Sequence, residues 1–432
     1  MTDARVILWG RDIGAVSWLE DREIGVFQYT PDFVQSGIEV APLMMPLREF
    51  PYEFPNLPRN TFKGLPGMLA DALPDKFGNA IIDAWLAANG KTAASFNPVE
   101  RLCYIGKRGM GALEFEPALF SSPNRGKSVQ LAALVDLANR ILDERSQLGG
   151  ALVGEDDQDA IEHILRVGTS AGGARAKAIL AWNPQTGEFR SGQLNLEAGF
   201  EHWLIKFDGI SGNGDRELAD PRGYGLVEYA YHLMAVAAGI DMFPCRLHHE
   251  GGRSHFMTKR FDRTPSGGKR HMQSLGALGH YDYNQPTSYS YEQALQVIRR
   301  LDSTTEAAEQ QLLRAIFNVV SRNQDDHVKN IAFLMNRRGE WRLSPAYDIS
   351  YAWNPGGAWT GQHQMSLNGK RDNFDRDDFI ALAQSGNIKA RRAQELIDRV
   401  IQAVTQWPHF AAQVGIVEER ATQIARAHRT TL

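Results

Sequence analysis

The sequence is poor in cysteine, with only Cys103 and Cys245 among its 432 residues. The two lie far apart and neither has a second cysteine nearby, which argues against a disulfide framework and a cysteine-based zinc site. Such low cysteine content is typical of proteins from a reducing compartment. The first residues also lack a basic stretch followed by an apolar one, so we expect no secretory signal peptide.

A long uninterrupted apolar run is also missing. The most apolar long window, residues 226–243, contains Glu228 and His232, which favours a buried helix over a membrane span. The net charge of −4 is small for this length and indicates no general affinity for nucleic acid or anionic lipid. We therefore expect a cytoplasmic protein that does not bind a membrane.

Two familiar site patterns are absent. His248, His249, Glu250 and His255 lie close together but without the H-E-x-x-H spacing of a metal hydrolase, and they are interpreted as a polar hairpin turn. The Gly-rich stretch GTSAGGARAKAIL, residues 168–180, is not a Walker A motif. Its small residues would still let backbone N–H groups approach phosphates, although a flexible hairpin is the plainer interpretation.

The composition, 43% hydrophobic and 23% charged, is that of a globular protein with room for two or three substructures. Short β-like runs dominate the first half and helical patterns the second. We predict three parts: an N-terminal subdomain over 1–118, a β-rich lobe over 129–262 and a helical lobe over 263–432.

Several elements are predicted from local patterns. Apolar residues at helical spacing predict a helix over 75–90, and residues 102–117 are interpreted as two strands around a Gly-rich hairpin. The polar, Gly-rich segment 263–288 indicates a surface loop. Helices and short strands are expected after residue 290, the helices over 291–301 and 306–320 and the strands over 331–336 and 341–344.

Chemically reactive side chains are densest in SRNQDDHVKNIAFL, residues 321–334. Asp325 and Asn330 have the D-x-x-x-x-N spacing that joins a catalytic aspartate to a metal-binding asparagine in protein kinases. Asp326, one position nearer to Asn330, does not have that spacing. Carboxylate and amide oxygens suit Mg²⁺, which accompanies ATP in phosphoryl transfer.

Two further residues fit the same chemistry. Asp348 follows a β-like run 23 positions after Asp325, where a second metal-binding carboxylate is expected. Lys206 lies in the apolar strand HWLIKFD, where nucleotide phosphates would compensate its buried charge. Glu228, in the following helix, could pair with Lys206.

Each feature alone has a plainer interpretation. A D-x-x-x-x-N pair occurs by chance in most chains of this length, Lys206 could be an edge-strand residue with an exposed tip, and Asp348 could form a turn. Their common order and spacing, with a Gly-rich loop ahead of Lys206, favour a kinase site.

Taken together, these motifs resemble the HipA family of bacterial serine/threonine kinases, the toxins of type II toxin–antitoxin pairs. NQDDHVKN is similar to the family's catalytic stretch and PAYDIS to its metal-binding element. SAGGARAK, HWLIKFD, FMTKRFDR and GLPGMLADALPDKFGNAII resemble its phosphate loop, lysine strand, interlobe segment and N-terminal subdomain. The resemblance implies an α+β, two-lobed, protein-kinase-like fold with a β-rich N-terminal lobe, an extra N-terminal subdomain and a mainly helical C-terminal lobe.

The resemblance also implies roles for the catalytic residues. Asp325 would be the catalytic base, Asn330 and Asp348 would bind Mg²⁺, and Lys206 would contact the ATP phosphates. His327 would support the metal site. Lys329 would neutralise phosphate charge.

In the phosphate-binding loop, the resemblance implies ATP contacts from Ser170, Ala171, Gly172, Gly173 and Lys177. Ser170 aligns with a serine that family members autophosphorylate to switch the kinase off. Thr169 is a second acceptor candidate.

The hinge from Lys259 to Phe261 would meet the adenine through backbone groups, although Lys259 stands where an acidic residue is common. Asp326 stands where glycine is frequent, and it would either tighten Mg²⁺ binding or face solvent.

The partners implied are a helix-turn-helix, HipB-like antitoxin, DNA mainly through that antitoxin, and a protein substrate. The family's targets include an aminoacyl-tRNA synthetase, whose phosphorylation arrests growth. Two alternatives stay open on the residues alone. One is a catalytically weak ATP-binding partner of the antitoxin, and the other is a small-molecule kinase with the same Asp and Asn arrangement.

Overall fold

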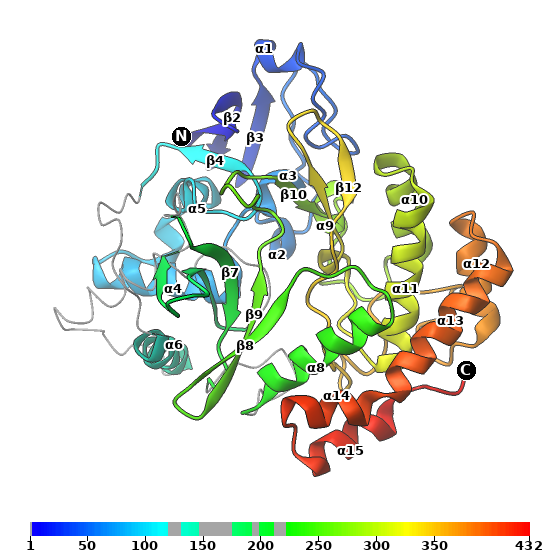
Figure 1. Ribbon diagram of the computed structural model, residues 1–432. Coiled ribbons are helices and arrows are strands. Elements are labelled where there is room, and N and C mark those ends of the chain that lie inside the picture. Colours follow the sequence, from blue (N-terminus) through cyan, green and yellow to red (C-terminus); the bar gives the residue numbers. More distant parts are fainter. Residues whose placement is uncertain (1, 120–130, 147–174, 192–197, 211–221) are drawn as a thin grey trace.

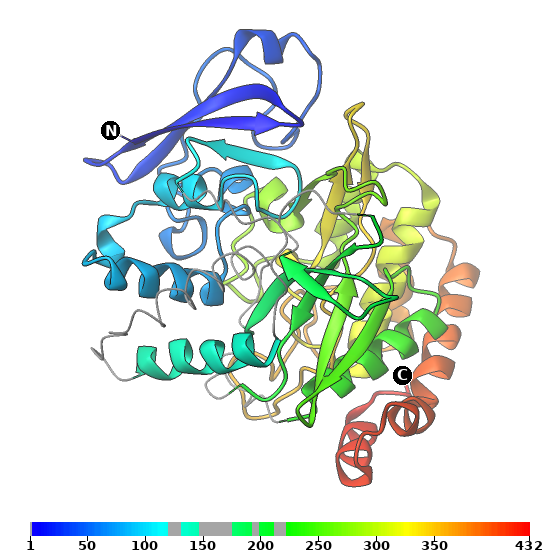
Figure 2. The same ribbon diagram turned by 60° about the vertical axis from the view of Figure 1, so that its left-hand side comes forward.

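The computed structural model describes residues 2–119, 131–146, 175–191, 198–210 and 222–432 (Figure 1). Within these ranges the strands form antiparallel sheets of four, five and three strands. Figures 1 and 2 show the four-stranded sheet at one end of the molecule and the last two helices at the opposite end. None of the described helices combines the length and apolar character that crossing a membrane requires.

The four-stranded sheet is built from the start and the end of the N-terminal part. Its order is β3-β2-β1-β4, and the strands are Thr2–Leu8 (β1), Arg11–Leu19 (β2), Ile24–Tyr29 (β3) and Leu113–Glu116 (β4). Phe115 of β4 lies opposite Val6 of β1, so the two ends of this part meet. The intervening chain forms Pro31–Val34 (α1), Arg59–Phe62 (α2), Gly67–Ala70 (α3), Lys76–Ala88 (α4) and Pro98–Ile105 (α5).

The sequence predicts α4 correctly and α5 wrongly. Asp75 caps α4 by accepting a hydrogen bond from the Gly78 amide at 2.6 Å. The first of the two strands expected over 102–117 is instead helical, and only β4 is a strand. Asn97 and Glu100 form a capping box at the start of α5, which stabilises a helix despite the β-favouring residues that follow.

The five-stranded sheet carries the lysines of the predicted nucleotide site. Its order is β6-β5-β7-β9-β8, and the strands are Lys177–Trp182 (β5), Phe189–Ser191 (β6), Glu201–Lys206 (β7), Cys245–Glu250 (β8) and Arg253–Lys259 (β9). Helix Tyr224–Ala237 (α8) packs against β8 and β9. Lys177 lies directly opposite Lys206 in the β5–β7 pair, so the two residues share one end of the sheet.

One hydrophobic core joins α4 to this sheet. Phe77 and Ile81 of α4 are buried together with Leu134 of helix Leu131–Ser146 (α6) and with Ile205 and Met257 of the sheet. The N-terminal part therefore supplies a helix to the core of the five-stranded sheet.

The second half is mainly helical, as the sequence predicts. Its helices are Leu275–Gly279 (α9), Tyr291–Leu301 (α10), Thr305–Ser321 (α11), Arg376–Ser385 (α12), Ala390–Thr405 (α13), Trp407–Val414 (α14) and Glu418–Ala427 (α15). The three-stranded sheet contains His271–Ser274 (β10), Ala332–Met335 (β11) and Trp341–Leu343 (β12). Strand β10 and helix α9 correct the expected surface loop over 263–288. A larger core runs from the four-stranded sheet into these helices.

Asp262 fixes the N-terminal part to the segment after β9. The carboxylate, with no exposed surface, accepts hydrogen bonds from Arg260 Nη2 at 2.6 Å, Arg263 Nη1 at 2.7 Å and the Gly111 amide at 2.7 Å. Burial alone would raise the pKa of Asp262, but the two guanidinium groups lower it below its usual value. The carboxylate is therefore ionised in the folded protein at neutral pH.

Asp262→Asn is expected to lower the free energy of unfolding at pH 7 by roughly 3–5 kcal/mol, because it leaves two buried cations without their anion. A lowered pKa adds stability that is complete above the pKa of an unfolded aspartate, about 3.9, and is lost as the pH falls. Urea unfolding should therefore show a smaller difference between variant and wild type near pH 3. Asp21→Asn, at an exposed aspartate, is the control; an equal difference at both pH values would contradict this account.

Candidate active site

Lys206, the last residue of β7, binds two carboxylates from different parts of the fold. Its Nζ lies 2.5 Å from Glu228 Oε1 on α8 and 2.6 Å from Asp348 Oδ1 in the segment after β12. The contact with Glu228 confirms the predicted pairing. One ammonium group therefore joins the five-stranded sheet, α8 and the helical half of the protein.

The charges of this cluster stabilise one another. Burial alone would lower the pKa of the Lys206 ammonium, but Asp348 and Glu228 raise it above its usual value. Burial likewise works against the Asp348 carboxylate, yet Lys206 holds the pKa of Asp348 below its usual range. Both groups are charged at neutral pH.

Two contacts fix the backbone that presents Asp348. The Ala346 amide donates to Asp241 O at 2.8 Å, and the Tyr347 hydroxyl donates to Lys329 O at 2.6 Å. Asp348 itself has a φ of +57°, a left-handed conformation that is uncommon for a residue other than glycine. Such conformations persist where the surrounding structure enforces them, and they cluster at functional sites.

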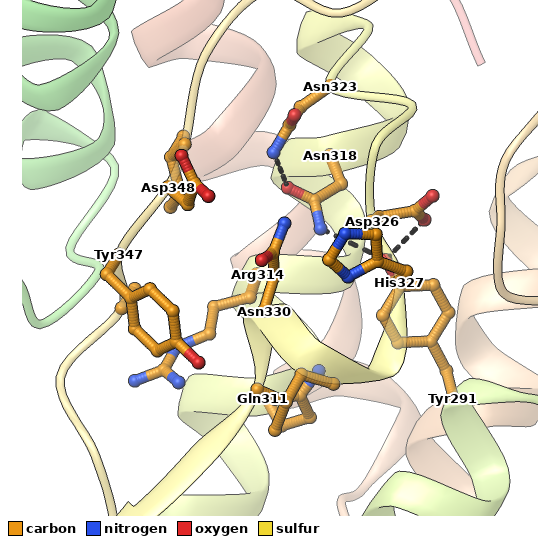
Figure 3. A pocket seen from close by; sticks show the side chains of 13 residues that line it. Tyr291, Gln311, Arg314, Asn318, Asn323, Asp326, His327, Asn330, Tyr347 and Asp348 are labelled. Carbon is orange, nitrogen blue, oxygen red and sulfur yellow. Dashed lines mark hydrogen bonds between the residues drawn. The ribbon is translucent and has the colours of Figure 1, made fainter. Parts of the chain in front are cut away.

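The stretch singled out in the sequence forms the connection between α11 and β11, which ends in a short 3-10 helix over Val328–Asn330. Asn330 Nδ2 donates to Asp325 O at 2.9 Å within this connection. Asn330, His327, Tyr347 and Asp348 line a common pocket (Figure 3). The fold thus brings together Asn330 and Asp348, the two residues for which the sequence predicts a metal.

The side chains of Asn330 and Asp348 suit Mg²⁺. An amide oxygen and a carboxylate are hard ligands, and Mg²⁺ commonly takes one or two protein oxygens and completes its shell with water and phosphate oxygens. No group of three or more His, Cys, Asp or Glu side chains with a metal-binding arrangement occurs among the residues that the structure describes.

Asp325, the predicted base, contacts a residue that the sequence does not point to. Trp359 Nε1 donates to Asp325 Oδ1 at 2.8 Å, and His327 Nε2 lies 3.8 Å from the same oxygen. The His327 ring lies near the rings of both Trp359 and Tyr283. The Lys329 ammonium lies 5.1 Å from the centre of the Tyr283 ring.

One of the two roles that the sequence suggests for Asp326, facing solvent, is wrong, whereas its effect on Mg²⁺ binding stays a prediction. Asp326 is 4% exposed, so it does not face solvent. Its carboxylate accepts hydrogen bonds from the Tyr291 hydroxyl at 2.6 Å and the Gln364 amide at 2.8 Å, and it lies 2.8 Å from His363 Nδ1. Figure 3 shows it on the Tyr291 side of the pocket, opposite Asp348. Asp326 is a buried structural carboxylate.

Two further cations lie beside Lys206. The Arg175 guanidinium lies over the Tyr224 ring, 3.2 Å from its centre, and 3.8 Å from Glu228. Lys177, buried in β5, has its Nζ 3.2 Å from Asp75 Oδ2 at the start of α4. Burial raises the pKa of Asp75 and lowers that of Lys177, so the contact opposes a strong desolvation cost on both sides.

The side chains of two residues in the predicted hinge, Lys259 and Phe261, have partners within the protein. Lys259 Nζ binds Glu201 Oε1 at 2.6 Å, and the Lys259 amide donates to Pro244 O at 2.9 Å. Phe261 is buried, and its ring lies 5.7 Å from that of Tyr347. The structure therefore brings Phe261 next to the Asp348 segment but gives Lys259 no contact with it. Thr169, Ser170, Ala171, Gly172 and Gly173 lie outside the described residues.

Three residues of the site were missed in the sequence. Arg175 could have been found from its position two residues before Lys177, which is a candidate site residue. Residues two positions apart in an extended chain point to the same side, so Arg175 would face the same site. Asp75 is the first residue of the helix predicted over 75–90, and nothing in that pattern indicates its contact with Lys177. Trp359 lies 34 positions after Asp325, and no spacing rule connects the two.

Family models match most of the chain. A HipA N-terminal domain model matches residues 4–116, and a HipA-like C-terminal domain model matches residues 169–407. The chain is also 27% identical, over 165 residues, to a Sinorhizobium fredii protein named "Putative kinase Y4mE". That match covers 34% of this chain and 39% of the other protein.

A solved structure shows the same fold. The HipA structure of Shewanella oneidensis MR-1, determined with HipB and operator DNA, aligns with a TM-score of 0.65 at 17% identity, over 99% of this chain and 95% of that one. The Helicobacter pylori proinflammatory kinase CtkA aligns with a TM-score of 0.36 at 11% identity, over 60% and 86%, which is too low to define a shared fold. The predicted two-lobed, kinase-like α+β fold is confirmed.

The pair between Asp75 and Lys177 generates a stability prediction. Asp75→Asn keeps an acceptable helix cap but removes a buried charge, so it should lower the free energy of unfolding by roughly 3 kcal/mol. Adding Lys177→Met should recover part of that loss, because the uncompensated cation is gone.

Chemical denaturation of the single and double variants checks this. The matched control is Asp375→Asn, since Asp375 also caps a helix but is largely exposed. A loss for Asp75→Asn no larger than that of the control would refute a charge-dependent pair.

Proposed function

The chain belongs to the HipA family, and from that premise we propose that it is an ATP- and Mg²⁺-dependent serine/threonine protein kinase. The observation that carries the proposal is the Lys206 ammonium held by both Glu228 and Asp348. Protein kinases need a strand lysine paired with a helix glutamate and an aspartate that binds the metal, and here the three groups are in contact. Asp325 and Asn330 supply the remaining pair.

The proposed roles follow from the chemistry of each side chain. Asn330 and Asp348 hold Mg²⁺, which neutralises charge on the phosphates when it is bound. Lys206 orients the phosphates of ATP, with Lys177 and Arg175 adding positive charge nearby. Asp325 accepts the proton of the acceptor hydroxyl, the role of the catalytic-loop aspartate in kinases.

We assign supporting roles to His327 and Lys329, which lie in the same segment as Asp325. His327 lies 3.8 Å from the Asp325 carboxylate and helps to define its surroundings. The positive charge of Lys329 acts on the Asp75 side of the site, since Lys329 lowers the pKa of Asp75 against the effect of burial. Lys329 therefore adds positive charge near the proposed phosphate site, while His327 lies beside the proposed base.

The family resemblance supports further proposals about regulation and partners. Ser170 is the proposed autophosphorylation site, and its modification switches the enzyme off. A helix-turn-helix antitoxin similar to HipB is the proposed partner, because the Shewanella HipA was solved with HipB and operator DNA. A gel shift in which the chain retards operator DNA only together with the antitoxin would support this.

The proposed substrate is a protein of translation, such as an aminoacyl-tRNA synthetase, in the cytoplasm. The alternatives are a small-molecule kinase and an inactive ATP-binding partner of the antitoxin. Phosphoproteomes of cells that express wild type or an inactive variant separate them. A new phosphoprotein supports the proposal, whereas transfer only to small molecules, or no transfer by a protein that binds ATP, would favour the alternatives.

Asp325→Asn should lower the rate of phosphoryl transfer by about 10²–10⁴-fold, because the amide cannot accept the proton. ATP binding and the melting temperature should change little, since the substitution is nearly isosteric and its oxygen can still accept from Trp359. Radiolabelled ATP with Mg²⁺ and calorimetry measure the two quantities. The control is Asp398→Asn on α13, an exposed site. Retained transfer in Asp325→Asn would remove Asp325 from its proposed role.

Incubation of wild type with Mg-ATP should place one phosphate on Ser170, as read by mass spectrometry. Ser170→Ala should abolish this label, and Thr169→Ala should leave it in place. The reverse pattern would move the modification to Thr169. Label on neither residue, with ATP bound, would argue against autophosphorylation of this loop.

A further inference from the structure

The contact between Trp359 and Asp325 joins two segments with separate places in the sequence. Trp359 belongs to the loop 353–364, which follows Asp348 and precedes α12. Its side chain is 9% exposed, and its indole N–H donates to Asp325 Oδ1 at 2.8 Å. A buried indole N–H needs an acceptor, and in this fold the acceptor is the carboxylate proposed as the base.

The neighbouring aspartate holds the other end of the same loop. Asp326 accepts a hydrogen bond from the Gln364 amide at 2.8 Å and lies 2.8 Å from His363 Nδ1. The Gln364 side chain in turn donates to the carbonyl of Trp359. All of these groups are buried, so the hydrogen bonds are made away from competing water.

Tyr291 of α10 secures Asp326 from the opposite side. Its hydroxyl donates to Asp326 Oδ2 at 2.6 Å and accepts from Asn318 Nδ2 at 3.0 Å (Figure 3). Burial alone would raise the pKa of Asp326, but His363 and the hydrogen bonds lower it. The ionised form is therefore the one that fits this position.

Resting on the proposed function, we propose that Trp359 is the positioning residue for Asp325, and that Asp326 holds Trp359 in place through His363 and Gln364. The two adjacent aspartates then have complementary tasks. Asp325 reacts, and Asp326 fixes the loop that orients Asp325.

The chemistry of an indole suits this task. The Trp N–H is a donor only, so it orients a carboxylate without competing for the proton that the carboxylate must accept. It is also neutral, so it adds no positive charge that would make Asp325 a weaker base. A hydrogen bond to a charged acceptor is stronger than one between neutral groups, and it restricts rotation of the carboxylate. Small errors in the orientation of a catalytic group are costly in rate.

The test is Trp359→Phe in the full-length protein, with Trp353→Phe as the matched control. Trp353 lies in the same loop and stacks on Arg322 at 4.4 Å. Trp359→Phe should lower kcat by about 10–100-fold with the KM for ATP within about twofold of wild type, as expected when one charged hydrogen bond at the reacting group is lost. Trp353→Phe should keep the wild-type kcat.

Asp326→Asn provides a second variant with a distinct expectation. It should also lower kcat at constant KM for ATP, and adding it to Trp359→Phe should give no further loss, because both changes act through one contact. If the loss of kcat in the double variant equals the product of the two single losses, the link between Asp326 and Trp359 is overturned. If Trp359→Phe does not fold, the kcat and KM values of Asp326→Asn test the proposal instead. An unchanged kcat in Asp326→Asn overturns the proposal.

The outcomes separate this inference from the proposed function. If the wild type is active and Trp359→Phe has the same kcat, the positioning role of Trp359 is overturned and the proposed function is not. A raised KM for ATP at constant kcat also overturns it, since that pattern indicates nucleotide binding. A wild type that binds ATP but transfers no phosphate removes the proposed function, and this inference with it.

Discussion

The Lys206 ammonium is the group on which the arrangement of the site depends. A buried lysine is costly unless its charge is compensated, and here the compensation comes from Glu228 on α8 and Asp348 after β12. These carboxylates belong to different halves of the molecule. The relative placement of the two halves is therefore tied to the electrostatics of one cation.

The same balance extends to the neighbouring charges. Arg175 and Lys177 add two cations, and Asp75 adds a third carboxylate. Among the described residues around Lys206, cations and anions are thus close to equal in number. Under the proposed function, a polyphosphate with its metal would compete with these carboxylates for the lysines, so that protein ion pairs would be exchanged for ligand ion pairs.

The local motifs of the site could be predicted from the sequence, and so could the pairing of Lys206 with Glu228, whereas two other long-range contacts could not. Asp325, Asn330 and Asp348 follow spacing rules within a short segment, and Lys206 stands out in an apolar strand. The contacts of Trp359 and Asp75 depend on tertiary packing, which no single-sequence pattern specifies. Within the fold, α5 was missed for a different reason, because a local capping box of Asn97 and Glu100 decided the conformation of residues that favour a strand.

The shared cores have a consequence for modularity. Residues of α4 complete the core of the five-stranded sheet, and the four-stranded sheet shares a second core with the helical half. Without its first 118 residues the chain would expose apolar surface on both lobes and lose the carboxylate that compensates Lys177. The kinase-like part therefore depends on its N-terminal extension, which supplies core residues to both lobes, so that removing the extension would destabilise each of them.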